Sequence, residues 1–104
     1  MRLVIVVYEA AVEESIQHLL TRLNLAGWTK LEGATGFGRK GLREGTAIWP
    51  GTNNLLFVEL SEGQLTPFLD ALARLKRSYR RPPGVHAFVQ AVTGAPLGVE
   101  DIVQ

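Results

Sequence analysis

The sequence predicts an α+β fold in which a four-stranded antiparallel sheet carries two helices on one face. Four short runs rich in β-branched and aromatic residues alternate with two stretches of helical periodicity, in the order βαββαβ. Two βαβ halves with right-handed crossovers place both helices on the same side of the sheet, which is the ferredoxin-like arrangement. A length of 104 residues allows one core, so residues 1–104 are expected to form a single domain.

The first half of the chain is predicted to form a strand, a helix and a second strand. Leu3 to Tyr8 is a continuous apolar run, as expected of a strand that is buried on both faces. From Val12 to Leu23 apolar residues recur at helical spacing. Glu13 and Glu14 fall in the first turn, where the positive end of the helix dipole favours carboxylates. Trp28 to Glu32 then reads as the second strand.

The second half repeats this order. Leu55 to Leu60 is a third apolar run, and Leu65 to Leu75 has helical periodicity. This helix begins either at Thr66–Pro67, as an N-cap and N1 pair, or one turn earlier with Ser61 as its cap. After a Pro-Pro-Gly stop, Val85 to Val92 alternates as the last strand.

A long glycine-rich segment between the second and third strands is the main candidate for a functional site. No regular element fits residues 33–53, and connections of this length are usually functional. Gly36 and Gly38 permit close approach of the backbone to a ligand, and Arg39 and Lys40 add positive charge beside it. This combination favours an anionic ligand.

Both faces of the predicted sheet carry apolar side chains, although the helices cover only one. Apolar residues occupy both sets of alternating positions in the first strand: Leu3, Ile5 and Val7 on one face, and Val4, Val6 and Tyr8 on the other. Burial of such side chains stabilises by about 1.5–3 kcal/mol each, so self-association is expected. A glutamate at Val6 or Val58 is expected to damage assembly or solubility. The alternation of residues does not decide which face of the sheet points away from the helices.

Composition and charge exclude several classes of protein. A formal net charge of +1 lacks the basic excess of a nucleic-acid binder. The apolar amino-terminal run is too short to cross a bilayer, so no membrane insertion is expected. The absence of cysteine suits a reducing compartment, and the cytoplasm is the expected location. No serine or threonine stands in a recognisable arrangement with a histidine and an acid, so no catalytic residue is assigned and no enzyme is expected.

Two motifs carry a family resemblance: Gly27-Trp28-Thr29 at the start of the second strand, and Gly36-Phe37-Gly38-Arg39 in the long loop. With them, the chain resembles the PII signal-transduction superfamily over nearly its whole length. The resemblance implies a homotrimer that binds an adenine nucleotide (ADP, AMP or ATP) in the clefts between subunits. It also implies an adenine contact for the first motif, and a backbone or phosphate-side role for the second.

The chain departs from the usual PII pattern where that family binds phosphate and 2-oxoglutarate. Lys40 replaces a glutamine that helps to hold magnesium and 2-oxoglutarate, which argues against 2-oxoglutarate sensing. The glycine-rich phosphate segment before the last strand is replaced by residues 79–86, in which Arg80 and Arg81 could reach an anion across a subunit boundary. We therefore expect ADP or AMP to bind at least as well as ATP.

The resemblance further implies that residues 36–54 contact a target protein, for example a transporter or a metabolic enzyme. The candidate contact residues are Arg43, Trp49, Asn53 and Asn54.

Two alternative functions are compatible with the same predicted architecture. One is a trimeric metal-binding protein of the divalent-cation-tolerance type, for which His86 is the candidate ligand. The other is a small ferredoxin-like enzyme.

Overall fold

A computed structural model describes residues 1–25, 27–35 and 52–93 of the chain. Its strands are β1 (Arg2–Glu9), β2 (Trp28–Ala34), β3 (Asn53–Leu60) and β4 (Val85–Ala91). They form one sheet in the order β2-β3-β1-β4, with antiparallel neighbours throughout. A 3-10 turn, η1 (Ala10–Val12), leads into α1 (Glu13–Arg22), and α2 (Glu62–Arg77) joins β3 to β4.

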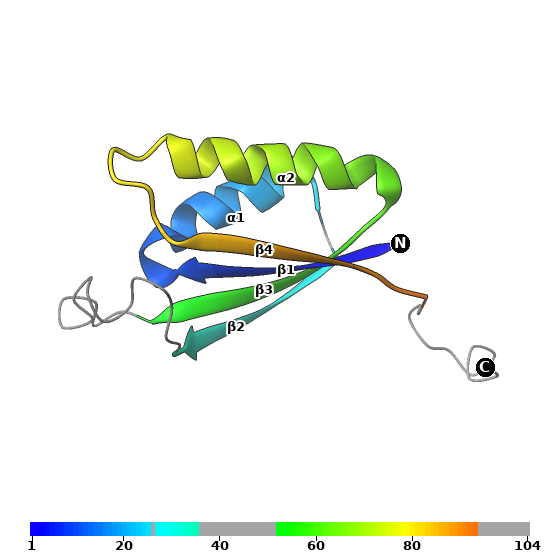
Figure 1. The fold of residues 1–104 in the computed structure, drawn as a ribbon, viewed down its shortest axis with the longest axis horizontal. Helices are drawn as coiled ribbons and strands as arrows, with labels where there is room; N and C mark the ends of the chain where they lie inside the picture. Colours follow the sequence, from blue (N-terminus) through cyan, green and yellow to red (C-terminus); the bar gives the residue numbers. More distant parts are fainter. Residues whose placement is uncertain (26, 36–51, 94–104) are drawn as a thin grey trace.

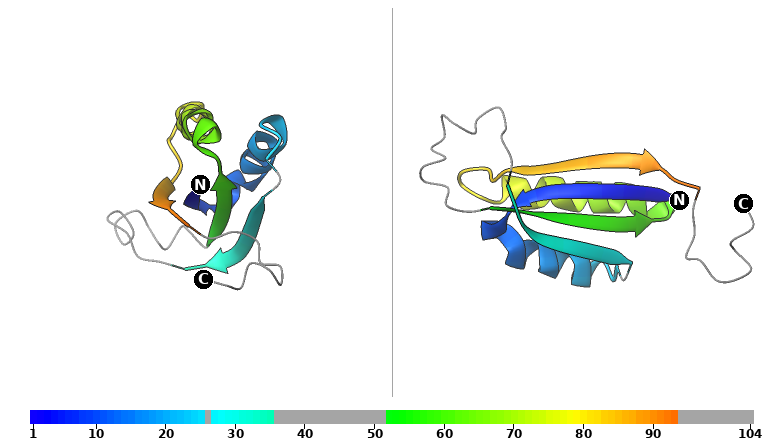
Figure 2. Two further views of the ribbon diagram at one scale, coloured as in Figure 1. Left: turned by 90° about the vertical axis from the view of Figure 1, so that its right-hand side faces the viewer. Right: turned by 90° about the horizontal axis from the view of Figure 1, so that it is seen from below.

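Both helices lie on one side of the sheet, as Figures 1 and 2 show. The predicted α+β, ferredoxin-like arrangement is therefore confirmed. The strand boundaries differ from the prediction by a few residues. In particular, β2 extends to Ala34 and β3 begins at Asn53 rather than at Leu55, so both ends of the expected loop belong to the sheet.

Helix α1 ends in a Schellman motif built on an asparagine. Asn24 has a φ of 57°, the left-handed conformation that asparagine tolerates better than most residues. Its amide donates to the Thr21 carbonyl, and the Leu25 amide donates to the Leu20 carbonyl, both at 3.0 Å. These two bonds satisfy carbonyls that the helix end would otherwise leave unpaired. The chain can then turn back toward β2.

Helix α2 begins at Glu62, with Ser61 as its N-cap. The earlier of the two predicted starts is thus correct, and the start at Thr66–Pro67 is wrong. The Gln64 side chain accepts a hydrogen bond from the Ser61 amide at 3.0 Å, and the Gln64 amide donates to the Ser61 carbonyl at 3.1 Å. These two bonds stabilise a helix start at this earlier turn. Pro67 lies inside the helix.

The core lies between the sheet and the two helices. Its sheet side consists of alternate residues of the two central strands, which are buried: Val4, Val6, Tyr8, Leu56, Val58 and Leu60. Its helix side includes the buried residues Ile16, Leu19, Leu20, Phe68 and Leu72. The first strand is therefore apolar on both faces but covered by helices on only one.

Val6 and Val58 lie on the helix-covered face and are fully buried. The expectation that a glutamate at either position would act through assembly is corrected, because the charge would enter the core and oppose folding. The outward face instead carries Ile5 and Val7 of β1, opposite Phe57 and Leu55 of β3.

No helix in the described ranges is both long enough and apolar enough to span a bilayer.

Candidate functional site

One end of the sheet gathers several of the segments that the sequence singled out. At this end β1 stops opposite the start of β3, through the pair Glu9 and Asn53. The last residue of β2, Ala34, also pairs with Asn53, and Val85 at the start of β4 pairs with Tyr8. Residues 36–51 fall between β2 and β3 in the sequence and lie outside the described residues, and the turn after α2 enters β4 at this end of the sheet (Figure 1).

Glu13 anchors this end of the molecule through four hydrogen bonds. Its Oε1 accepts from the Tyr8 hydroxyl at 2.5 Å and from Asn54 Nδ2 at 2.9 Å. Its Oε2 accepts from Lys30 Nζ at 2.7 Å and from Gln17 Nε2 at 3.1 Å. One carboxylate therefore joins β1, α1, β2 and β3, because its donors come from each of these elements.

The surroundings fix the charge of this carboxylate. Burial raises the pKa of Glu13, but hydrogen bonds from Lys30, Tyr8, Asn54 and Gln17 together lower it below its ordinary value of 4.5. Burial raises the pKa of Tyr8, and its bond to the Glu13 carboxylate raises it further. At neutral pH the cluster therefore holds an ionised Glu13 and a neutral Tyr8 as donor.

A β-bulge shapes the end of β2. The register with β3 shifts between Leu31 and Ala34, and Gly33 adopts a φ of 80°. The Gly33 amide points to Asn54 Oδ1 at 3.4 Å, so Asn54 binds both the bulge and Glu13. Asn54 is only 4% exposed. Its side chain is used within the chain, so the predicted contact of Asn54 with a target protein is corrected.

The turn before β4 lies at the same end of the sheet. The Glu9 amide donates to the Gly84 carbonyl at 3.0 Å, and Lys76 Nζ donates to the Val85 carbonyl at 3.3 Å. Arg80 and Arg81 are exposed, and neither forms an ion pair with a described residue. The turn thus presents two cations to solvent at the end of the sheet where β2 ends and β3 begins.

The first of the two sequence motifs lies at the other end of the sheet. The Gly27 carbonyl accepts a hydrogen bond from the Glu59 amide at 3.0 Å, and Trp28 pairs with Val58 near the end of β3. Trp28 and Ala34 are the two ends of β2, which lie roughly 20 Å apart along an extended strand. Within one copy of the chain, Gly27, Trp28 and Thr29 are therefore not brought together with Arg80 and Arg81.

The remaining predicted residues are placed as follows. Residues 36–40, Arg43 and Trp49 lie outside the described residues. His86 is exposed on β4, opposite Val7, on the face without helices. Within the described ranges, no three His, Asp or Glu side chains gather as a metal site would require.

The sequence did not reveal the role of Glu13. A carboxylate in the first turn was explained by the helix dipole alone, and its partner Asn54 is 41 residues away. Only the pairing of β1 with β3 brings the two together. The apolar neighbours of Tyr8 likewise gave no sign that its hydroxyl would meet a carboxylate.

No protein-family model and no curated protein sequence matches the chain. Among solved structures, CPII, a nitrogen regulatory PII-like protein of Thiomonas intermedia K12 bound to ADP, AMP and bicarbonate, is similar with a TM-score of 0.64 and 19% identity. This match covers 88% of the present chain and 86% of CPII.

Two further solved structures are similar. A protein of Thermus thermophilus described as PII-like and signalling matches with a TM-score of 0.56 and 29% identity, over 86% of this chain and 82% of that one. A DUF3240 family protein of Shewanella baltica matches with a TM-score of 0.67 and 18% identity, over 93% and 96%. These likenesses extend over nearly the whole fold.

Proposed function

We propose that this chain, a divergent member of the PII-like superfamily, is a regulatory protein that binds a small anionic effector in clefts between its own copies. The proposed effector is an adenine nucleotide, ADP or AMP at least as readily as ATP. The proposed assembly is a homotrimer in the cytoplasm. The segment between β2 and β3, with Arg43 and Trp49, contacts a target protein, and the chain acts by binding rather than by catalysis.

One observation carries this proposal: the two predicted halves of the effector site lie at opposite ends of the same sheet. Gly27 precedes β2 and Trp28 and Thr29 begin it, whereas Arg80 and Arg81 precede β4 at the other end. Side chains roughly 20 Å apart on one copy are too far apart to line one cleft for a small effector. Two copies packed through their helix-free faces offer a way for these halves to line one cleft.

The helix-free face supports such packing because its central rows are apolar. Ile5 of β1 lies between Phe57 of β3 and Phe88 of β4. The next row places Leu31 and Leu55 beside Val7. Two edge-strand residues of these rows, Leu31 and Phe88, are more than half exposed, at 55% and 57%. Exposed apolar patches of this kind usually mark an interface.

The local charge favours an anionic effector. Arg80 and Arg81 are free of ion pairs with described residues, and they lie at the end of the sheet where β2 ends and β3 begins, the two strands that residues 36–51 connect in the sequence. That segment adds Arg39 and Lys40 between glycines. The CPII structure named above holds ADP, AMP and bicarbonate, all of which are anions. The Glu13 cluster, which bonds both β2 and β3, would hold these two strands in place while the effector binds.

Isothermal titration calorimetry of the full chain tests the effector. We expect ADP or AMP to bind at least as tightly as ATP, and magnesium with 2-oxoglutarate to add little, because Lys40 stands where a glutamine would be needed. Arg39→Ala or Arg81→Ala should weaken binding by about 1.5–3 kcal/mol, the value of a hydrogen bond to a charged group. Arg22→Ala is the control, since this exposed arginine lies on α1, on the helix-covered side of the sheet, and is not among the predicted effector contacts.

Two outcomes would contradict the nucleotide proposal. If none of the three nucleotides binds, the adenine effector is wrong. If the chain instead binds copper or zinc and loses that response in His86→Ala, the metal-binding alternative is correct. Hydrolysis of a bound nucleotide by the purified chain would show that it is an enzyme.

A further inference from the structure

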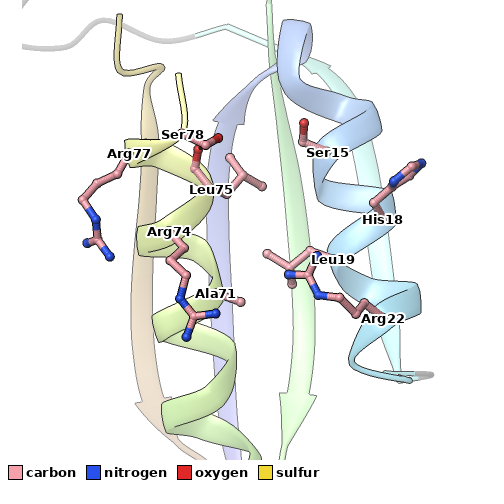
Figure 3. Close-up of a pocket in the computed structure, with 9 residues that line it drawn as sticks. All are labelled: Ser15, His18, Leu19, Arg22, Ala71, Arg74, Leu75, Arg77 and Ser78. Atoms are coloured by element: carbon pink, nitrogen blue, oxygen red, sulfur yellow. The ribbon is translucent and has the colours of Figure 1, made fainter. Parts of the chain in front are cut away.

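A groove between α1 and α2 lies on the opposite side of the molecule from the helix-free sheet face. It has a volume of about 660 Å³, and its walls come from residues 15–22 of α1 and from the second half of α2 (Figure 3). The proposed effector cleft and the proposed subunit interface do not use this surface. The groove is therefore available for a separate interaction.

The floor of the groove is apolar. Leu19 and Ala71 are buried, at 1% and 4% exposed, and Leu75 is half-buried. Figure 3 shows these side chains in the space between the two helices. Aliphatic side chains of an occupant could therefore pack onto this floor and leave water.

The rim of the groove is cationic. Arg22 reaches from α1 toward α2, and Arg74 lies along the α2 wall, while Arg77 and His18 stand at the outer edges (Figure 3). Among the described residues, no acidic side chain lines the groove. Within the described part of the chain, none of these three arginines forms an ion pair. The whole chain carries a formal net charge of only +1, so this local excess reflects the arrangement of the charges.

The hydroxyl groups of the groove are used within the chain. The Ser15 and Tyr79 hydroxyls lie 2.6 Å apart and link α1 to the turn after α2. The Ser78 hydroxyl donates to the Leu75 carbonyl at 2.7 Å. The arginines are thus the main polar groups offered to a ligand, and they are spread along the groove instead of converging on one point.

We propose that this groove docks an acidic amphipathic helix of a partner protein. Apolar residues on one face of that helix pack onto Leu19, Ala71 and Leu75, and carboxylates on its flanks pair with Arg22 and Arg74. A helix that binds in an apolar groove does so through apolar residues at positions i, i+3, i+4 and i+7. Its carboxylates would carry the opposite charge to the arginines of the rim. A nucleic acid fits less well, because it would leave the apolar floor unused and needs a larger basic surface.

Fluorescence anisotropy with a labelled synthetic peptide tests the proposal on the full chain. The probe is a helical peptide with leucines at i, i+3, i+4 and i+7 and glutamates on both flanks. We expect saturable binding that weakens with added salt. The double variant Arg22→Glu with Arg74→Glu should lower the affinity by at least about tenfold. Arg80→Glu with Arg81→Glu makes the same change of charge outside the groove and should leave peptide binding unchanged.

Several results would overturn the proposal. These are no binding of the acidic peptide, equal binding of a peptide with lysines in place of the glutamates, and unchanged affinity in a groove variant that circular dichroism shows to be folded. Displacement of the peptide by inorganic phosphate or ADP would also overturn it, since the groove would then be a small-anion site. The groove variant should still bind ADP as the parent chain does, so the two proposals fail independently.

Discussion

At the scale of single residues, Glu13 contributes most to the candidate site. Its carboxylate is shared by donors from four elements, two of which, β2 and β3, are distant from it in sequence. Each donor satisfies part of a group that is costly to bury alone, and together they keep the group ionised. The cluster therefore links these four elements at the edge of the apolar core.

Glu13→Gln should lower the free energy of unfolding by about 1.5–3 kcal/mol at neutral pH. The amide keeps the shape of the side chain but loses the charge that pairs with Lys30, and its nitrogen cannot accept a hydrogen bond. Urea denaturation followed by circular dichroism measures the change. The neighbouring substitution Glu14→Gln is the control: Glu14 is exposed, and its removal should change the stability by no more than about 0.5 kcal/mol.

The same pair of proteins should differ in pH dependence. The pKa of Glu13 is lowered in the folded chain, so the stabilisation that its charge provides is complete above the ordinary value of 4.5. It is lost as the pH falls through the lower, folded-state pKa. The difference in stability between the parent chain and Glu13→Gln should therefore shrink in acid, and a constant difference would show that the charge contributes nothing.

At the scale of elements, the bulge at the end of β2 sets how the chain leaves the sheet. Gly33 holds a φ of 80°, which an L side chain adopts only with strain, and no atom lies within 4 Å of a Cβ added there. The effect of a substitution at this position is thus conformational rather than steric. Asn54 on β3 bonds the bulge and the Glu13 cluster at once, so the two features support each other.

Gly33→Ala should destabilise the chain by about 1–2 kcal/mol because of its positive φ. Gly63→Ala is a matched control, since a Cβ at this α2 position also meets nothing within 4 Å. There alanine should stabilise by about 0.5 kcal/mol through its higher helix propensity. Chemical denaturation of both variants checks the pair. Equal effects of the same sign would contradict the role assigned to the bulge.

At the scale of the whole molecule, the sequence predicted the order of elements and the layered fold, because β-branched runs and helical periodicity leave few topologies for 104 residues. It did not predict which pleat face of β1 lies outward, since Val4 and Ile5 are equally apolar and only the position of the helices decides. Nor did it predict the Glu13 cluster, which depends on strand pairing over long separations. The site motifs were identified by resemblance, and the fold alone assigns them no ligand.

Because Ile5 lies on the helix-free face, a charge at Ile5 tests assembly more directly than a charge at the buried Val6 or Val58. Ile5 lies on the helix-free face between Phe57 and Phe88, so Ile5→Glu would place a charge in the middle of the proposed interface. Each apolar side chain buried there would contribute about 1.5–3 kcal/mol, whereas an unpaired charge would oppose association. Light scattering coupled to size-exclusion chromatography should find a trimer for the parent chain and a folded monomer for the variant.

Ala73→Glu supplies the control for that measurement. Ala73 is exposed on α2, on the opposite side of the molecule, so the same new charge should leave the trimer intact. Circular dichroism separates loss of assembly from loss of folding in both variants. A parent chain that is a stable monomer at micromolar concentration would contradict the trimer. It would also remove the cleft between copies, because Gly27, Trp28 and Thr29 could then never meet Arg80 and Arg81 around one effector.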